Sequence, residues 1–260
     1  MIRKEIKYSI IIPTLNEEEN IGKLLESLRI KSEYFKKNAE IIIIDGESND
    51  NTIEICNKYG VAVKVSERGR GNQLIEGAKY ARGNYLIFLH ADLIPPIDFF
   101  DYLDRNIDDN FKIATFRMKL DVNKLLYKLY SFFTRFDSIF STFGDQGLVV
   151  SKVFYGKIGG FKNIPIMEDV DFFKRVRKIE KIRKFDKNII VSSRMFKKEG
   201  VVKTQIKSAV FIIKYLLGAD PELLYKLYYK RIDEYQKSNY RFYKISGIRK
   251  SQNKIGFNNK

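Results

Sequence analysis

The chain has 260 residues, 44% of them hydrophobic and 14% aromatic, which is enough for one large α/β domain with a helical tail. This composition excludes an intrinsically disordered chain, and the single cysteine, Cys56, excludes an intrachain disulfide. The formal net charge is +16, and residues 171–260 account for all of it, with 24 basic and 8 acidic side chains. A region of this kind predicts either an anionic partner or a solvated basic tail.

The start of the chain lacks the apolar stretch and small-residue cleavage site of a signal peptide and indicates a short basic lead into a strand. No uncharged apolar run approaches the roughly 20 residues that a membrane-spanning helix needs. We therefore expect a cytoplasmic protein that does not cross a membrane. The lone cysteine fits a reducing compartment.

Strand and helix patterns alternate through the first 92 residues. We expect strands at residues 8–12, 41–44, 61–65 and 85–89, the first of them ended by Pro13. Helices should begin after Asn16, after Asn49 or Asp50, and at residue 71. This alternation predicts right-handed βαβ crossovers and a mostly parallel sheet flanked by helices.

Ligands of such sheets bind beyond the carboxyl ends of the strands. Here those ends are polar or charged, at residues 13–17, 45–48, 67–70 and 90–92, and they should converge on one rim. Thr14, Asn16, Glu17 and Asp45 are candidates for hydrogen bonds to a base and ribose. Arg68 or Arg70 can pair with phosphate oxygens, although loop polarity and helix capping explain some of these residues equally well.

The second half is less regular. Core packing is the favoured interpretation of its aromatic-rich stretch, residues 124–143, and an acceptor groove is the alternative. Residues 203–217 predict a helix with one apolar face and lysines elsewhere. That face consists of Ile206, Val210, Ile213 and Leu217. A basic amphipathic helix of this kind can lie on an anionic membrane surface, whereas packing of Val210 and Ile213 on the core is the competing interpretation.

Two further segments carry chemistry. His90 and Asp92 follow an apolar strand, where a carboxylate suits a divalent cation shared with substrate phosphates. His90, the only histidine, is a candidate ligand, although a lone histidine is more often structural. Residues 167–171 place three acids within four positions, one of which can act as a general base, unless they serve only the helix dipole.

Taken in order, the segments SIIIPTLNEEENI, IIIIDGESND, ARGNYLIFLHAD, GGF and MEDVD resemble the family 2, GT-A-type inverting glycosyltransferases over residues 8–200. Within that family the sequence looks most like a subgroup associated with radical-SAM and selenium-related proteins. That pattern comprises LHAD at 89–92, GDQG at 144–147, GGF at 159–161, MED at 167–169 and the segment 194–200.

The resemblance implies roles for individual residues. Pro13, Thr14, Asn16, Glu17 and Asp45 would line the nucleotide pocket together with Arg70 and Asp92. Asp92, with His90 at the position of the usual first acid, would hold Mn²⁺ or Mg²⁺, and Asp169 would be the catalytic base. Contacts to acceptor or diphosphate would come from Asp145, Gln146, Glu168 and Arg194. Gly46 stands where the family commonly has a second acid, and the usual Q-x-x-R-W segment is missing.

We therefore expect a glycosyltransferase domain at residues 1–200, with a nucleotide-binding half at 1–92 and an acceptor and catalytic half at 93–200. A basic helical extension follows at 201–260. The expected partners are a nucleotide-sugar, with UDP-sugar favoured, an acceptor that a lipid can carry, and an anionic surface on the inner face of the membrane. No nucleic acid is expected.

One rival function stays open, a non-catalytic protein that binds anionic surfaces or nucleic acid on a degenerate transferase fold. The acid-bearing strand ends favour an enzyme over that alternative. A dinucleotide-binding protein is disfavoured, because the third glycine after Gly69 and Gly71 comes too late for G-x-G-x-x-G. A sugar nucleotidyltransferase would need a glycine-rich loop where residues 13–16 stand.

Overall fold

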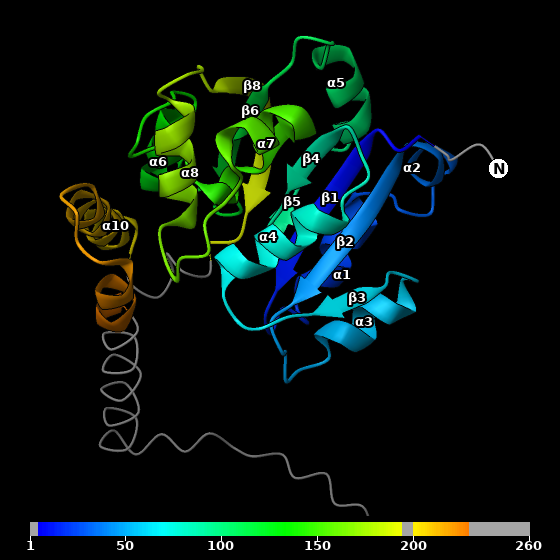
Figure 1. Ribbon diagram of the computed structural model, residues 1–260, viewed down its shortest axis with the longest axis horizontal. Helices are drawn as coiled ribbons and strands as arrows, with labels where there is room; N and C mark the ends of the chain where they lie inside the picture. The colour runs from blue at the N-terminus through cyan, green and yellow to red at the C-terminus, as the bar shows by residue number, and fades with distance from the viewer. Residues whose placement is uncertain (1–4, 194–199, 229–260) are drawn as a thin grey trace, which may run out of the picture.

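The computed structural model describes residues 5–193 and 200–228. It contains one eight-stranded sheet with the order β3-β2-β1-β4-β7-β6-β8-β5 (Figure 1). Strands β1 to β4 are mutually parallel, β7 is antiparallel to both β4 and β6, β8 is parallel to β6, and β5 is antiparallel to β8. The predicted α/β fold with a mostly parallel sheet is confirmed.

The first half consists of alternating strands and helices. In chain order these are β1 (Tyr8–Thr14), α1 (Ile21–Ser27), α2 (Glu33–Asn38), β2 (Ala39–Asp45), α3 (Thr52–Lys58), β3 (Val63–Val65), α4 (Arg70–Tyr80) and β4 (Tyr85–Phe88). Strand β1 runs through Pro13 to Thr14, so the prediction that Pro13 ends it was wrong. β4 pairs with β1 only as far as Ile11, so the missing N–H of Pro13 leaves that ladder intact.

The second half completes the sheet and adds the helices around the site. Its elements are β5 (Leu93–Ile94), α5 (Phe99–Asn106), β6 (Ile113–Leu120), α6 (Leu125–Phe133), the 3₁₀ turn η1 (Gly144–Gln146), β7 (Leu148–Ser151), α7 (Lys152–Ile158), α8 (Glu168–Val176), β8 (Arg183–Val191) and α10 (Val201–Leu216). Residues 221–228 are also helical. The predicted C-terminal helix is confirmed as α10.

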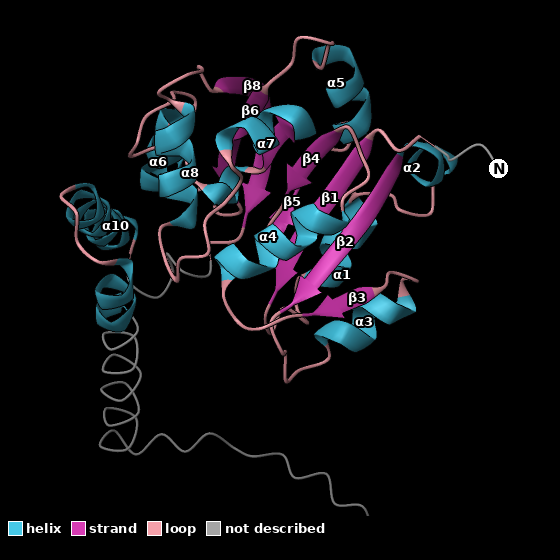
Figure 2. Ribbon diagram, viewed as in Figure 1, coloured by secondary structure: helices cyan, strands magenta, loops and turns pink. Residues whose placement is uncertain are grey.

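Helices cover both faces of the sheet, and each face has its own hydrophobic core (Figure 2). One core joins β1 to α1, α2, α3 and α5 through residues such as Ile10 and Leu24. The other joins it to α4, α7 and α8 through residues such as Ile11 and Phe172. Alternate residues of β1 point to opposite cores, as expected for a strand buried on both faces.

The aromatic-rich stretch does not behave as expected. Tyr127 is buried, but Phe132, Phe133, Phe136 and Phe140 are between 45% and 55% exposed. The expectation of core packing was therefore wrong for these four phenylalanines. Helical spacing identifies an apolar face, but it does not say whether that face points to the core or to solvent.

Candidate active site

The carboxyl ends of β1 and β2 are joined by a buried hydrogen-bond network. The Thr14 hydroxyl donates to Oδ2 of Asp45 at 2.7 Å, and the backbone N–H of Ser48 donates to Oδ1 of the same carboxylate at 2.7 Å. Asp45 is fully buried, and the Ser48 hydroxyl also donates to it at 2.6 Å. Asp45 thus joins the end of β1 to the loop that follows β2, so its buried carboxylate stabilises the rim.

Gln73, which the sequence analysis did not single out, fixes the same strand ends from α4. Its side-chain amide donates to the backbone oxygens of Thr14 and Ile44, each at 2.8 Å, and the side chain is buried. A buried amide that bridges two parallel strands costs little, because both N–H groups are satisfied. The signal for it was a polar residue on the buried side of α4, where the other buried residues are Gly71, Leu74 and Gly77.

Among the described residues, three of the four non-glycine residues with a positive φ angle lie in the loops after β1 and β2 or at the start of α8. Asn16, Glu47 and Met167 have φ angles of 56°, 63° and 68°, a region that residues other than glycine rarely adopt. The exposed Asn16 is held by two bonds, because its N–H donates to the Ser48 hydroxyl and its Oδ1 accepts from the Asn49 N–H, each at 2.8 Å. Such conformations persist where the surroundings enforce them, and they cluster at functional sites.

Glu17 lies on the same loop and braces it. Its backbone N–H donates to the Thr52 hydroxyl at 2.8 Å, and its carboxylate accepts from the Asn20 side chain at 2.6 Å. Pro13 is partly buried one residue before Thr14. Pro13, Thr14, Asn16, Glu17 and Asp45 therefore gather at one end of the sheet, but a role in binding a nucleotide stays a prediction.

Arg70 and Glu168 link the first turn of α4 to the first turn of α8. Their side chains form an ion pair in which Glu168 is 2% exposed and Arg70 is 44% exposed. Burial raises the pKa of Glu168, and Arg70 opposes that rise. Gly71 permits this approach, since a Cβ there would lie 3.0 Å from the backbone oxygen of Lys162. The exposed part of Arg70 leaves a positive charge at the rim.

Asp169 lies against the turn that contains the GDQG segment. Its Oδ2 accepts a hydrogen bond from the backbone N–H of Gly144 at 2.9 Å. A Cβ on Gly144 would lie 3.4 Å from both Asp169 Oδ2 and His90 Nε2. The glycine therefore keeps open a small space between these two side chains. Burial and the charge of Arg70 lower the pKa of His90 to about 3, so its imidazole is neutral.

Asp145 adds a second carboxylate at this point. Burial, followed by the charges of Asp169 and Asp92, raises the pKa of Asp145 to about 7. Its Oδ1 is buried without a hydrogen-bond partner. Asp92 and Asp169 thus lie close enough to Asp145 for their charges to act on it, and Arg70 supplies part of the countercharge; these three acids are called the carboxylate cluster below.

The cluster fits a divalent cation that is held in part by substrate. Within residues 5–193 and 200–228, no three His, Cys, Asp or Glu side chains are arranged as a complete metal site. The free Oδ1 of Asp145 and the space beside Gly144 nevertheless lie next to excess negative charge. Mg²⁺ and Mn²⁺ sites of transferases commonly use one or two carboxylates with substrate phosphates and water, which matches this donor set.

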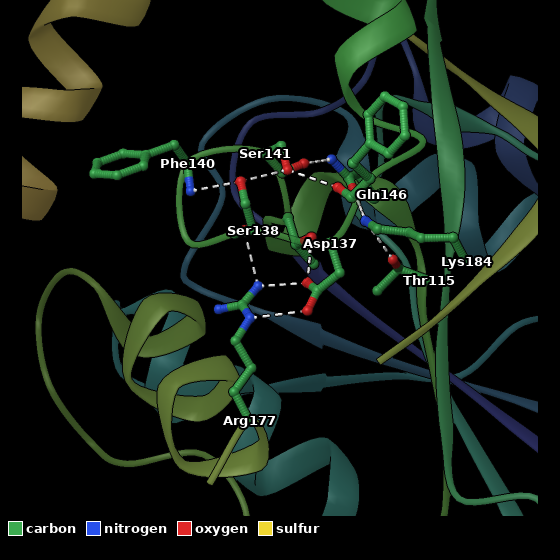
Figure 3. Close-up of polar contacts among 10 residues, drawn as sticks. Thr115, Asp137, Ser138, Phe140, Ser141, Gln146, Arg177 and Lys184 are labelled. Carbon is green, nitrogen blue, oxygen red and sulfur yellow. Dashed lines mark hydrogen bonds and ion pairs between the residues drawn. The ribbon is translucent and has the colours of Figure 1, made fainter. Parts of the chain in front are cut away.

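A polar network behind the site holds the GDQG turn in place (Figure 3). Arg177, just after α8, donates two bonds to Asp137, at 2.6 and 3.1 Å. Lys184 of β8 donates to Oε1 of Gln146 at 2.5 Å and to the Thr115 hydroxyl at 2.9 Å (Figure 3). Gln146 is fully buried, so it supports the turn from the inside and does not face the rim. Sequence pattern alone singled out neither Arg177 nor Lys184.

Arg194, the remaining predicted contact, lies outside the described residues. Apart from Gln146, which supports the turn from the inside, the other predicted site residues come together from β1, β2, α4, the loop after β4, η1 and α8.

The model of the glycosyl transferase family 2 matches residues 9–178. The chain belongs to this family. It is therefore an enzyme of the glycosyltransferase class. The matched range contains the segments that form the rim and the carboxylate cluster.

Curated relatives of this glycosyltransferase carry sugar-transfer names. It is 35% identical over 115 residues to "Dolichol-phosphate mannosyltransferase" of Pyrococcus furiosus, a match that covers 42% of this chain and 32% of that one. A glucuronosyltransferase of Methanococcus voltae, named for a dolichyl N-acetylglucosaminyl phosphate substrate, is 32% identical over 168 residues, covering 60% of this chain and 50% of that one. The chain thus spans about a third to a half of the length of these relatives.

Solved structures confirm the GT-A-type fold. TarS of Staphylococcus aureus, in complex with UDP-GlcNAc, superposes with a TM-score of 0.57 at 21% identity, covering 73% of this chain and 59% of that one. Glucosyl-3-phosphoglycerate synthase of Mycobacterium tuberculosis, in complex with Mn²⁺ and UDP, has a TM-score of 0.59 at 14% identity, covering 81% and 79%. At these identities the likeness establishes the fold.

Proposed function

We propose that this glycosyltransferase moves a sugar from a nucleotide-diphosphate sugar to an acceptor hydroxyl with inversion at the anomeric carbon. The observation that carries the proposal is the position of Asp169, which is oriented by Gly144 and lies among Arg70, His90 and the carboxylates of Asp92 and Asp145. One side of this rim has loops suited to the nucleobase, and the other side has a carboxylate that can accept a proton. This arrangement suits a single displacement at the anomeric carbon.

In that displacement Asp169 accepts the proton of the acceptor hydroxyl. The acceptor oxygen forms its bond to the anomeric carbon as the bond from that carbon to the phosphate oxygen breaks, and the electron pair leaves with the nucleoside diphosphate. Attack from the face opposite the leaving group inverts the configuration. A single carboxylate base is sufficient, whereas glycosidases use two carboxyl groups.

The donor would be held at the rim. Pro13, Thr14, Asn16, Glu17 and Asp45 would form the base and ribose pocket, in which Asp45 acts by fixing the loops. The exposed part of Arg70 would face the diphosphate, where a fixed positive charge stabilises the leaving group. Asp92, with His90 beside it, would hold Mn²⁺ or Mg²⁺, which when bound supplies further charge stabilisation to the diphosphate.

Three finer assignments belong to the same proposal. A UDP-sugar is the favoured donor, and UDP or UDP-GlcNAc is present in three of the similar solved structures, although GDP-mannose is present in a mannosyltransferase from Pyrobaculum calidifontis. A lipid-carried acceptor is supported by the dolichol-based names of two relatives. The GDQG and MED segments support the subgroup associated with radical-SAM and selenium-related proteins.

Thermal-shift measurements with UDP, GDP, dTDP and CDP, each with and without Mn²⁺, test the proposal. A ligand that binds only the folded state raises the melting temperature, so the donor nucleotide should stand out, and more strongly with Mn²⁺. If none of the four shifts the transition under either condition, the proposed donor site is wrong.

A further inference from the structure

Helix α6 presents an apolar face to solvent. Its exposed residues recur with helical spacing, and two of them, Leu125 and Phe133, are 81% and 53% exposed. The face consists of Leu125, Leu126, Leu129, Phe132 and Phe133. The opposite side is anchored by the buried Tyr127, so the helix is fixed with its apolar face outward. A contiguous exposed apolar face on a folded helix marks an interaction surface.

Aromatic rings extend this face beyond the end of α6. Phe132 packs edge-on against Phe133 and Phe136, with ring centroids 5.8 and 5.9 Å apart, and Arg135 lies 4.2 Å from the centre of the Phe132 ring. Phe140 is 47% exposed, and its ring points away from the buried polar network (Figure 3). The cluster thus combines aromatic rings with a cation, as membrane-interface segments do.

Helix α10 carries a second exposed apolar face and lies near α6 and α8 (Figure 1). The face consists of Val202, Ile206, Val210, Ile213 and Leu217. Val210 and Ile213 are 41% and 45% exposed, so the interpretation that they pack on the core was wrong. Tyr130 of α6 is hydrogen-bonded to Gln205 of α10, which fixes the two helices against each other.

The charges beside both faces are predominantly positive, and Asp137, the acid between Phe136 and Phe140, is paired with Arg177. Residues 122–136, around α6, contain Lys124, Lys128 and Arg135 and no acidic residue. Residues 201–218, around α10, contain three lysines and again no acidic residue. Apolar faces that are flanked by an excess of cations match an anionic lipid bilayer, in which the apolar residues enter the interface and the basic residues meet the headgroups. In the described residues no helix is long and apolar enough to span a bilayer.

We propose that α6, the segment that follows it as far as Phe140, and α10 together form a docking surface for an anionic membrane. The surface adjoins the candidate active site, because the Tyr215 hydroxyl of α10 donates a hydrogen bond at 3.0 Å to Asp171 of α8, the helix that carries Asp169. Docking through this surface would place the active site near the bilayer. A lipid-carried acceptor, which belongs to the proposed function, could then reach Asp169 without leaving the membrane.

Vesicle flotation with the full-length protein tests the surface. Vesicles with equal parts of phosphatidylglycerol and phosphatidylcholine should carry the wild type at low salt, whereas vesicles of phosphatidylcholine alone should carry much less. High salt should weaken the binding, because exposed charges are screened. The double variant Phe132→Glu/Phe133→Glu should lower the bound fraction by about tenfold or more, because two apolar side chains no longer enter the interface.

The matched control is Ile97→Glu/Val153→Glu, which makes the same change in charge at residues that are 74% and 85% exposed outside the surface. This control should float like the wild type, and both variants should keep the nucleotide-induced thermal shift of the wild type. If both double variants lose vesicle binding equally, the loss comes from the change in net charge and the proposal is overturned. It would also be overturned if the wild type stays unbound at low salt, or if only the Phe132→Glu/Phe133→Glu variant converts a dimer to a monomer, since a second copy would then cover the face.

Discussion

The backbone N–H of Gly144 donates a hydrogen bond to Oδ2 of Asp169 across 2.9 Å, although the two residues are 25 positions apart. This bond joins the GDQG turn to the first turn of α8. It orients one oxygen of the carboxylate, and the other, Oδ1, accepts from the N–H of Val170 at 2.8 Å. Asp169 is therefore held in one orientation, as a base must be to meet a bound hydroxyl.

Replacing Asp169 with asparagine should lower the rate of transfer by about 100-fold or more, because an amide cannot accept the acceptor proton. Nucleotide binding should be nearly unchanged, since the base acts on the acceptor. Turnover of the donor identified by thermal shift is the measurement. Asp171→Asn is the matched control in the same helix, where the carboxylate pairs with Arg175 at 2.8 Å. Retention of more than about a tenth of the wild-type rate by Asp169→Asn would transfer the role to Asp145.

Asp92→Ala should weaken Mn²⁺-dependent binding of the nucleoside diphosphate more than His90→Ala does. A carboxylate is the harder and charged ligand, so it suits Mn²⁺ or Mg²⁺ better than a neutral imidazole. Titration calorimetry with UDP in the presence and absence of Mn²⁺ compares the two variants with the wild type. Equal affinities for the wild type and Asp92→Ala would argue against a metal at this position.

The first half of the site could be predicted from sequence, and the second half only in part. Parallel strands with short crossovers bring their carboxyl ends to one edge, so the meeting of Thr14 with Asp45 follows from the alternation of elements. The contact of Gly144 with Asp169 could not be derived in this way. It depends on β7, which enters the middle of the sheet antiparallel to β4 and β6, and local patterns do not determine the position of such a strand.

Arg70→Met should destabilise the fold by about 2 kcal/mol, because it leaves the Glu168 carboxylate buried without its partner. This is less than the roughly 3–5 kcal/mol typical of pairs buried on both sides, since Arg70 is 44% exposed. Urea unfolding measures the change. The double variant Arg70→Met/Glu168→Leu should recover much of the loss, because no unpaired charge is then buried.

A comparison with Arg82→Met separates this effect from the loss of any arginine. Arg82 pairs with Glu40, but its side chain is 72% exposed, and Glu40 keeps bonds from the Ser9 hydroxyl and from the backbone of residue 82. We expect a loss of about 1 kcal/mol or less there. If Arg70→Met costs no more than Arg82→Met, Glu168 does not depend on Arg70 for its charge.

Lys184 should make stability depend on pH in an unusual direction. Burial, partly opposed by the charge of Asp137, lowers the pKa of this lysine from 10.5 to about 7. Between these two values the unfolded chain binds a proton that the folded protein has released, so raising the pH favours the folded state. Relative to Lys184→Met, the wild type should therefore gain stability from neutral pH to about pH 9.5, by at most about 1.4 kcal/mol per pH unit.

Lys187→Met removes a lysine of the same strand, whose side chain is 42% exposed beside Asp98, and serves as the control. Urea unfolding across this pH range would refute the assignment if both variants differ from the wild type by the same slope. In that case the pH dependence would come from elsewhere, and the bond from Lys184 to Gln146 would be that of an ordinary charged lysine supporting the GDQG turn.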